Sequence, residues 1–174
     1  MAKEVKSMLV NDRIMTESGS SELFESGRYG ILKANGRIQL SFLEALYLIE
    51  KERLKVFNQR RQEIDFESLF RKAKKQEQNL NVRYSVFRDF RDRGYIIKTA
   101  LKFGADFRVY DRGIKPGEDH AKWIVFAVHE GQTMTWRDFA AKNRVAHSTK
   151  KKLLIAVVDD EGDVSYWESR WLKP

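Results

Sequence analysis

The chain has 174 residues, of which 42% are hydrophobic and 12% aromatic, so it can bury a core and disorder is not expected. Its 33 lysines and arginines outnumber 25 aspartates and glutamates, and the resulting net charge of +8 suits a polyanionic partner without requiring one. Cysteine is absent, which excludes disulfides and thiolate metal sites. With no apolar run near the roughly 20 residues of a membrane helix and no signal-peptide core, we expect a soluble, cytoplasmic protein.

Residues 1–79 predict a small N-terminal α/β domain. Short strands are expected around Arg13–Met15 and Tyr29–Leu32, where apolar residues lie between Gly- and Ser-rich turns. A helix should begin after Ser41, because a glutamate three positions on completes a capping box. Asp65 is placed to cap a second helix, whose far end is rich in cations and leads into a connector.

Residues 80–174 predict a second domain of mixed α/β type, which gives the whole chain an α+β fold class. A first helix should end at Gly94, a natural C-terminal cap, and another should begin at Thr135 with capping-box spacing. A run of six apolar residues predicts a buried central strand. The expected strands are Tyr95–Lys98, Asp106–Tyr110, Trp123–Val128, Leu153–Val158 and Val164–Trp167.

Several short sequence motifs in this second half occur in a specific order. They are Arg93–Thr99, Leu101–Tyr110, Arg144–Ser148 and Ala156–Val164. Together they resemble the archaeal tRNA-intron splicing endonucleases, over most of the chain and most densely from Val82 onward. The resemblance implies a C-terminal catalytic domain with a compact, nuclease-like mixed sheet flanked by helices.

Three side chains in the same region as these motifs form a minimal set for breaking an RNA strand without a metal: Tyr110, His120 and Lys151. RNA carries its own nucleophile, the 2′-hydroxyl, so a catalyst needs a base, an acid and a cation for the phosphorane. The resemblance implies that Tyr110 is the general base, His120 the general acid and Lys151 the stabilising cation. It also implies 2′,3′-cyclic phosphate and 5′-hydroxyl products, with no metal or other cofactor.

Each of the three also has an ordinary interpretation, namely a packed tyrosine, a solvated loop histidine and a solvated helix end. Strand alternation places Tyr110 with Arg108 on the face opposite Phe107, expected to be the more solvent-exposed one. A free phenol with a pKa near 10 is a poor base, so Lys151 or Arg108 would have to lower that pKa. Ala121 departs from the family, which often has serine after the loop histidine.

The other two histidines serve as a comparison. His129 is interpreted as an inert turn residue, and His147 is expected to have a structural role near the site. Three histidines at spacings of 9 and 18 do not make a ligand pattern, so no metal site is predicted.

Substrate recognition in the resembled family involves the bulge–helix–bulge of precursor tRNA, whose unpaired bases can be stacked by guanidinium or aromatic groups. Arg144, seven residues before Lys151, matches a family arginine that sandwiches a bulged base; the alternative is an ordinary surface arginine. For the second sandwiching residue, Tyr166 and Trp167 are both candidates.

Two symmetric cuts need two active sites, and family members of this size form tetramers. The acidic turn Asp159–Asp163 resembles the loop that inserts into a basic cleft of a neighbouring subunit, whereas its alternative is a solvated hairpin tip. A homotetramer is expected, with a heterotetramer containing a non-catalytic chain left open. Two other functions compete with the endonuclease: a non-catalytic structural subunit of such an enzyme, and a basic RNA-binding module without chemistry.

Overall fold

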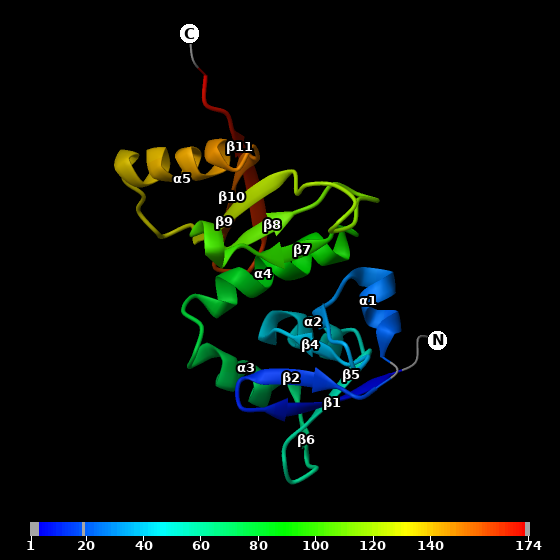
Figure 1. Ribbon diagram of the computed structural model, residues 1–174. Helices are drawn as coiled ribbons and strands as arrows, with labels where there is room; N and C mark the ends of the chain where they lie inside the picture. The colour runs from blue at the N-terminus through cyan, green and yellow to red at the C-terminus, as the bar shows by residue number, and fades with distance from the viewer. Residues whose placement is uncertain (1–3, 19, 173–174) are drawn as a thin grey trace. The chain divides into compact units, whose positions relative to one another are not determined.

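A computed structural model describes residues 4–18 and 20–172, and the chain divides into two compact units, Met1–Leu80 and Asn81–Pro174. Each unit contains its own sheet with helices packed against it, which confirms the predicted α+β fold class (Figure 1). Across the described residues, no helix combines the length and the apolar character that crossing a membrane requires.

The N-terminal unit is built on a six-stranded sheet with the order β3-β4-β2-β1-β5-β6, in which only β1 and β5 pair in parallel. Its helices are α1 (Ser21–Gly27), α2 (Phe42–Glu50) and α3 (Phe66–Lys74). The strands are β1 (Val5–Val10), β2 (Arg13–Thr16), β3 (Ile31–Leu32), β4 (Ile38–Leu40), β5 (Leu54–Phe57) and β6 (Glu63–Ile64).

Local sequence signals explain where two of these helices begin. The Ser41 hydroxyl accepts the Glu44 amide at 3.3 Å and the Glu44 carboxylate accepts the Ser41 amide at 3.0 Å, so the predicted capping box of α2 is confirmed. Asp65 caps α3 by accepting the Ser68 amide at 2.7 Å. The strand predicted at Tyr29–Leu32 is shorter than expected, because Gly30 has a φ of 67°, which interrupts the extended backbone before Ile31.

The C-terminal unit has a five-stranded sheet with the order β11-β10-β9-β8-β7. β9 and β10 are parallel and are joined by a crossover through α5, while the other pairs are antiparallel. Its elements are α4 (Leu80–Asp92), β7 (Ile97–Thr99), a 3₁₀ turn (Leu101–Phe103), β8 (Phe107–Val109), β9 (Trp123–His129), α5 (Trp136–Ser148), β10 (Lys152–Val158) and β11 (Val164–Ser169).

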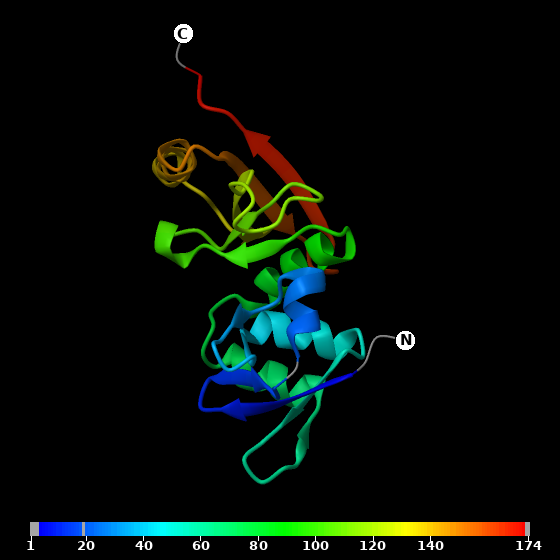
Figure 2. The ribbon, with the colours of Figure 1, turned by 45° about the vertical axis from the view of Figure 1, so that its right-hand side comes forward.

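The two helices of this unit cover opposite faces of its sheet (Figures 1 and 2). On one face, Ala146 of α5 joins a core cluster with Ile124 and Leu153. On the other, Phe87 of α4 lies 6.2 Å from the ring of Phe107. The sheet is therefore buried on both sides, which is why the interior strand β10 contains a continuous apolar run, although β9 occupies the centre of the sheet.

Candidate active site

The order of the strands brings three chain segments to one end of the C-terminal sheet. Because β8 runs antiparallel to β9 and β9 runs parallel to β10, the end of β8 lies beside the starts of the other two strands. Val109 pairs with Trp123, and Trp123 pairs with Lys152. Tyr110 and Lys151 each stand one residue outside this row, so topology places both at the same edge.

Tyr110 directly follows β8 and is held by its backbone amide, which donates to the Ile96 carbonyl at 3.0 Å. Arg108 and Tyr110 line one cavity, and the Arg108 guanidinium carbon lies 6.0 Å from the centre of the tyrosine ring. The two side chains therefore share a side of the strand, as alternation predicted. That face is the more exposed of the two, as expected, because Arg108 is half-buried whereas Phe107 and Val109 are fully buried. Tyr110 itself, however, is only 4% exposed and forms part of the cavity wall.

Lys151 lies in the short connection between α5 and β10. Lys150 adopts a left-handed conformation with φ of 54°, and the next amide closes back on the Ala146 carbonyl at 2.9 Å. This tight helix end leaves Lys150 exposed but turns Lys151 into a half-buried position, where its ammonium donates to the Thr149 carbonyl at 2.9 Å. The basic triplet is therefore more than a solvated helix end.

His120 is presented by the loop that precedes β9. Its amide donates to the Asp119 carboxylate at 2.6 Å, and the Lys115 amide donates to the Glu118 carboxylate at 3.2 Å. Gly117 has a φ of 98°, in the left-handed region that favours glycine. These local contacts order the loop backbone while the histidine itself stays exposed to solvent.

The three predicted residues line one cavity of about 400 Å³. The histidine comes from a loop, and the other two flank the sheet edge, so the cavity brings together an imidazole, a phenol and an ammonium group. The complete lining is Phe103, Arg108, Tyr110, Gly117, Glu118, Asp119, His120, Ala121 and Lys151.

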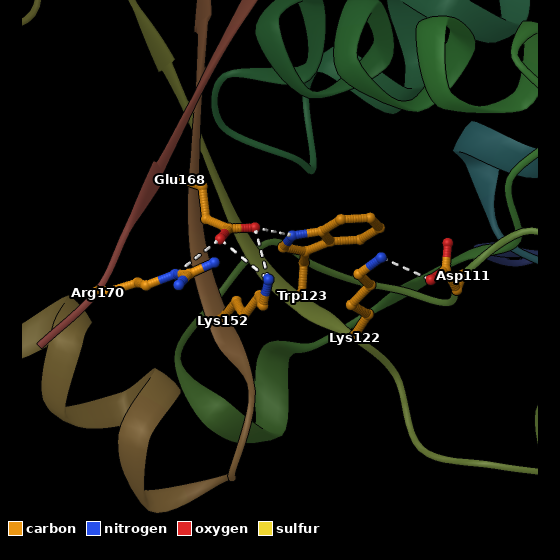
Figure 3. A network of polar contacts seen from close by, with 6 residues as sticks. All are labelled: Asp111, Lys122, Trp123, Lys152, Glu168 and Arg170. Atoms are coloured by element: carbon orange, nitrogen blue, oxygen red, sulfur yellow. Dashed lines mark hydrogen bonds and ion pairs between the residues drawn. The ribbon is translucent and has the colours of Figure 1, made fainter.

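A polar network braces the strands beside this cavity (Figure 3). The Glu168 carboxylate of β11 accepts the Trp123 indole N–H of β9 at 2.9 Å and the Lys152 ammonium of β10 at 3.1 Å. Arg170 also donates to it, at 3.3 Å. The hydrogen bond from Trp123, with the cations beside it, lowers the pKa of Glu168 to about 2. One carboxylate thus ties three strands together, next to Lys151.

A second pair in the same view joins the segments that carry the phenol and the imidazole (Figure 3). The Lys122 ammonium donates to the Asp111 carboxylate at 2.6 Å and thereby lowers the pKa of Asp111. The Lys122 backbone also links the strands, since its amide donates to the Val109 carbonyl at 2.8 Å and its carbonyl accepts the Lys152 amide at 3.0 Å. None of the residues in this network was predicted, because their partners are far apart in the chain.

Two family models match the chain. The model described as "tRNA intron endonuclease, N-terminal domain" matches residues 5–70, and "tRNA intron endonuclease, catalytic C-terminal domain" matches residues 80–166. The chain belongs to the tRNA intron endonuclease family. The predicted resemblance is thereby confirmed, and the cavity lies in the part that matches the catalytic domain of the tRNA intron endonucleases.

Curated members of the tRNA intron endonuclease family resemble this chain over its full length. A tRNA-splicing endonuclease of Pyrococcus abyssi (strain GE5 / Orsay) is 37% identical over 175 residues, and one of Pyrococcus furiosus is 39% identical; each alignment covers 99% of both chains. A tRNA-splicing endonuclease of Methanothermobacter thermautotrophicus is 38% identical over 168 residues, covering 95% of this chain and 96% of the relative.

The structure separates the two candidates for the second base-stacking residue. The Tyr166 hydroxyl donates to the Asp89 carboxylate at 2.6 Å, its ring packs 5.0 Å from Phe90, and burial raises its pKa. Trp167 points to the other face and is 57% exposed. Of the two, Trp167 is the side chain exposed to solvent.

Arg144 is exposed on α5 and does not line the cavity of Tyr110, His120 and Lys151. A neighbouring cavity of about 370 Å³ shares Lys151 with that cavity and includes His147, whose ring lies 4.5 Å from that of Trp171. The Trp171 contact was not predicted, because the residue follows the last expected strand.

His129, predicted to be inert, ends β9, and its imidazole lies 3.1 Å from the Asp160 carboxylate. Among the described residues, no group of three histidine, aspartate or glutamate side chains could hold a metal.

The Glu168 network predicts a stability effect with a defined pH dependence. Because the pKa of Glu168 is lower in the folded protein than in the unfolded chain, its contribution is present above about pH 4.5 and is lost as the pH falls through about 2. We expect Glu168→Gln to reduce the free energy of unfolding by about 1 kcal/mol at pH 7, since solvent screens a side chain that is 28% exposed. Urea denaturation at pH 7 and pH 2 measures this difference.

The matched control is Glu130→Gln, which removes a carboxylate from an exposed turn of the same unit. It should change the free energy of unfolding little at either pH. An equal effect of both variants at pH 7 would contradict the network's role.

Proposed function

We propose that this chain is a metal-independent RNA endonuclease that removes introns from precursor tRNA by cutting both bulges of a bulge–helix–bulge. The observation that carries the proposal is the single cavity lined by Tyr110, His120 and Lys151. The three curated relatives described above, each named tRNA-splicing endonuclease and at least 37% identical, support the substrate class.

The reaction follows from the chemistry of these groups. Tyr110, in its phenolate form, accepts the proton of the RNA 2′-hydroxyl and becomes a neutral phenol, and the 2′-oxygen attacks the adjacent phosphorus. The P–O5′ bond breaks, and the leaving oxygen takes a proton from His120. One strand thereby becomes a 2′,3′-cyclic phosphate end and a 5′-hydroxyl end, and no redox partner is needed.

Charge in the cavity favours each of these steps. Arg108 and Lys151 bring positive charge into the cavity of Tyr110, with the Arg108 guanidinium carbon 6.0 Å from the centre of the phenol ring. The Lys151 ammonium, oriented by the Thr149 carbonyl, is also available to the additional negative charge of the phosphorane. His120 is exposed, so a bound RNA strand can reach its imidazole without a rearrangement of the core.

The experiment that tests the function is a cleavage assay with a bulge–helix–bulge RNA in EDTA. We expect cuts in both bulges, with cyclic phosphate and 5′-hydroxyl ends identified by mass spectrometry. Binding without cleavage would favour an RNA-binding module or a non-catalytic subunit. Cleavage only after divalent ions are restored would contradict the metal-independent mechanism.

For assembly, we propose a homotetramer in which the acidic turn Asp159–Asp163 inserts into a basic cleft of a neighbouring copy. The turn is ordered locally, since the Asp163 amide donates to the Asp159 carboxylate at 2.8 Å and Gly162 has a φ of 88°. Asp160 and Glu161 remain exposed at its tip. Several carboxylates on one tight turn repel each other, and a basic partner relieves that repulsion.

Arg144 tests how bulged RNA is recognised. If its guanidinium stacks on a flipped base, Arg144→Ala should cost about 1–3 kcal/mol of binding to bulged RNA and almost nothing for a plain duplex. Arg144→Lys should rescue poorly, because an ammonium keeps the charge but lacks the planar face. Fluorescence anisotropy with both RNAs measures the effect, and equal losses on the two would reduce Arg144 to a phosphate contact.

A further inference from the structure

The N-terminal unit gathers positive charge on the exposed side of α3. Arg71, Lys72, Lys74 and Lys75 are all exposed, whereas Leu69 and Ala73 of the same helix are buried. Among the described residues, Lys72, Lys74 and Lys75 form no ion pair. Arg71 is attracted electrostatically to the nearby Asp65 carboxylate. The helix therefore presents cations that the chain itself leaves largely uncompensated.

Two adjoining hollows lie along these cations. The larger, an open depression of about 800 Å³, is lined by the end of α3, and the second, of about 430 Å³, is lined by the loops after β1 and β5. Lys72 lines both, so they form one continuous surface, called here the α3 surface. Its lining residues are Leu9, Asn11, Asn58, Gln59, Arg60, Gln62, Ser68, Arg71, Lys72, Lys74, Lys75 and Gln76.

The loop that carries Arg60 into this surface is held in place by its own hydrogen bonds. The Asn58 side-chain oxygen accepts the amides of Arg60 at 2.8 Å and Gln62 at 3.0 Å, and the Asn58 amide donates to the Gln62 carbonyl at 2.9 Å. Arg61 completes the turn with a φ of 62°. An ordered loop lowers the entropic cost of placing its arginines against a ligand.

The distribution of charge in this unit sets the α3 surface apart. Residues 1–80 hold 15 lysines and arginines against 12 aspartates and glutamates, and six of those cations but only three of the acidic residues lie between positions 60 and 75. The remaining nine cations are balanced by nine acidic residues. The positive surplus of the unit is thus concentrated in this one segment, and none of the residues lining the two hollows is acidic.

We propose that the α3 surface binds the sugar–phosphate backbone of double-helical RNA. Cations and side-chain amides are the groups that contact phosphates and 2′-hydroxyls without reading sequence. The lining contains no aromatic side chain, so it lacks the stacking platform that single-stranded RNA requires. The partner is a paired stem, and identifying it with a stem of the substrate rests on the proposed function.

The test compares Lys72→Ala/Lys75→Ala with Lys33→Ala/Arg37→Ala, a control that removes two cations from the β3–β4 turn of the same unit, outside both hollows. Binding of the full chain to a plain, unbulged RNA duplex is measured by anisotropy over a range of salt concentrations. The first variant should raise Kd about tenfold and reduce the slope of log Kd against log salt by about 2, while the control should change both little.

Cleavage and size measurements separate the remaining outcomes. At saturating bulged RNA, kcat of the Lys72→Ala/Lys75→Ala variant should stay within twofold of the wild type, since these side chains belong to another unit than the trio. Equal effects of both double variants would overturn the proposal, as would a change of molecular mass in light scattering, which would make the α3 surface a contact between subunits. A wild type that binds duplex RNA but cleaves nothing would reject the proposed function alone.

Discussion

Tyr110→Phe, His120→Ala and Lys151→Ala are each expected to slow RNA cleavage by about 10² or more while leaving RNA affinity within a few-fold. All three side chains line one cavity, and in the proposed mechanism each acts mainly on charge or protons that move in the transition state. Single-turnover cleavage of a bulge–helix–bulge RNA, with binding measured separately, distinguishes a loss of chemistry from a loss of affinity.

The control for this series is His129→Ala, because that imidazole ends β9 outside the cavity and should be dispensable. His147→Ala should also keep most activity, although His147 lines the neighbouring cavity that shares Lys151. Wild-type turnover by His120→Ala would remove the general-acid assignment, and unchanged turnover by Tyr110→Phe would remove the base.

Reversing charge on the acidic turn should have the second large effect. We expect Asp160→Lys with Asp163→Lys to convert the proposed tetramer into dimers and to abolish productive cleavage of both bulges. Both side chains are exposed at the turn, so the substitutions leave the core of the sheet intact while repelling a basic cleft. Multi-angle light scattering in moderate salt measures the mass, and the cleavage assay reports function.

Glu22→Lys with Glu25→Lys makes the same change of net charge on α1 and should leave the mass unchanged, since both carboxylates are exposed on that helix. A tetramer that survives the turn reversal would show that Asp159–Asp163 is a solvated hairpin. Dissociation by both double variants would point to net charge instead of a specific contact.

Short-range features of this protein follow from its sequence alone. The capping boxes at Ser41 and Thr135, the start of α3 at Asp65 and the buried strand within Leu153–Val158 all form as predicted. Each depends on residues within a few positions of one another, so the local pattern contains the necessary information. The family is likewise indicated by short sequence motifs in a fixed order, and these motifs can be recognised without knowing how the chain folds.

Contacts between distant segments were decided only by the tertiary structure. The burial of Tyr110, the inward turn of Lys151 and the exposure of Trp167 depend on which strands pair and which helix covers each face. Glu168 meets Trp123 across 45 positions, a partnership that no local pattern encodes. The parallel pairing of β1 with β5 and of β9 with β10 brings distant residues side by side. For this reason the sequence could indicate the candidate catalytic residues, whereas their position in one cavity follows from the order of the strands.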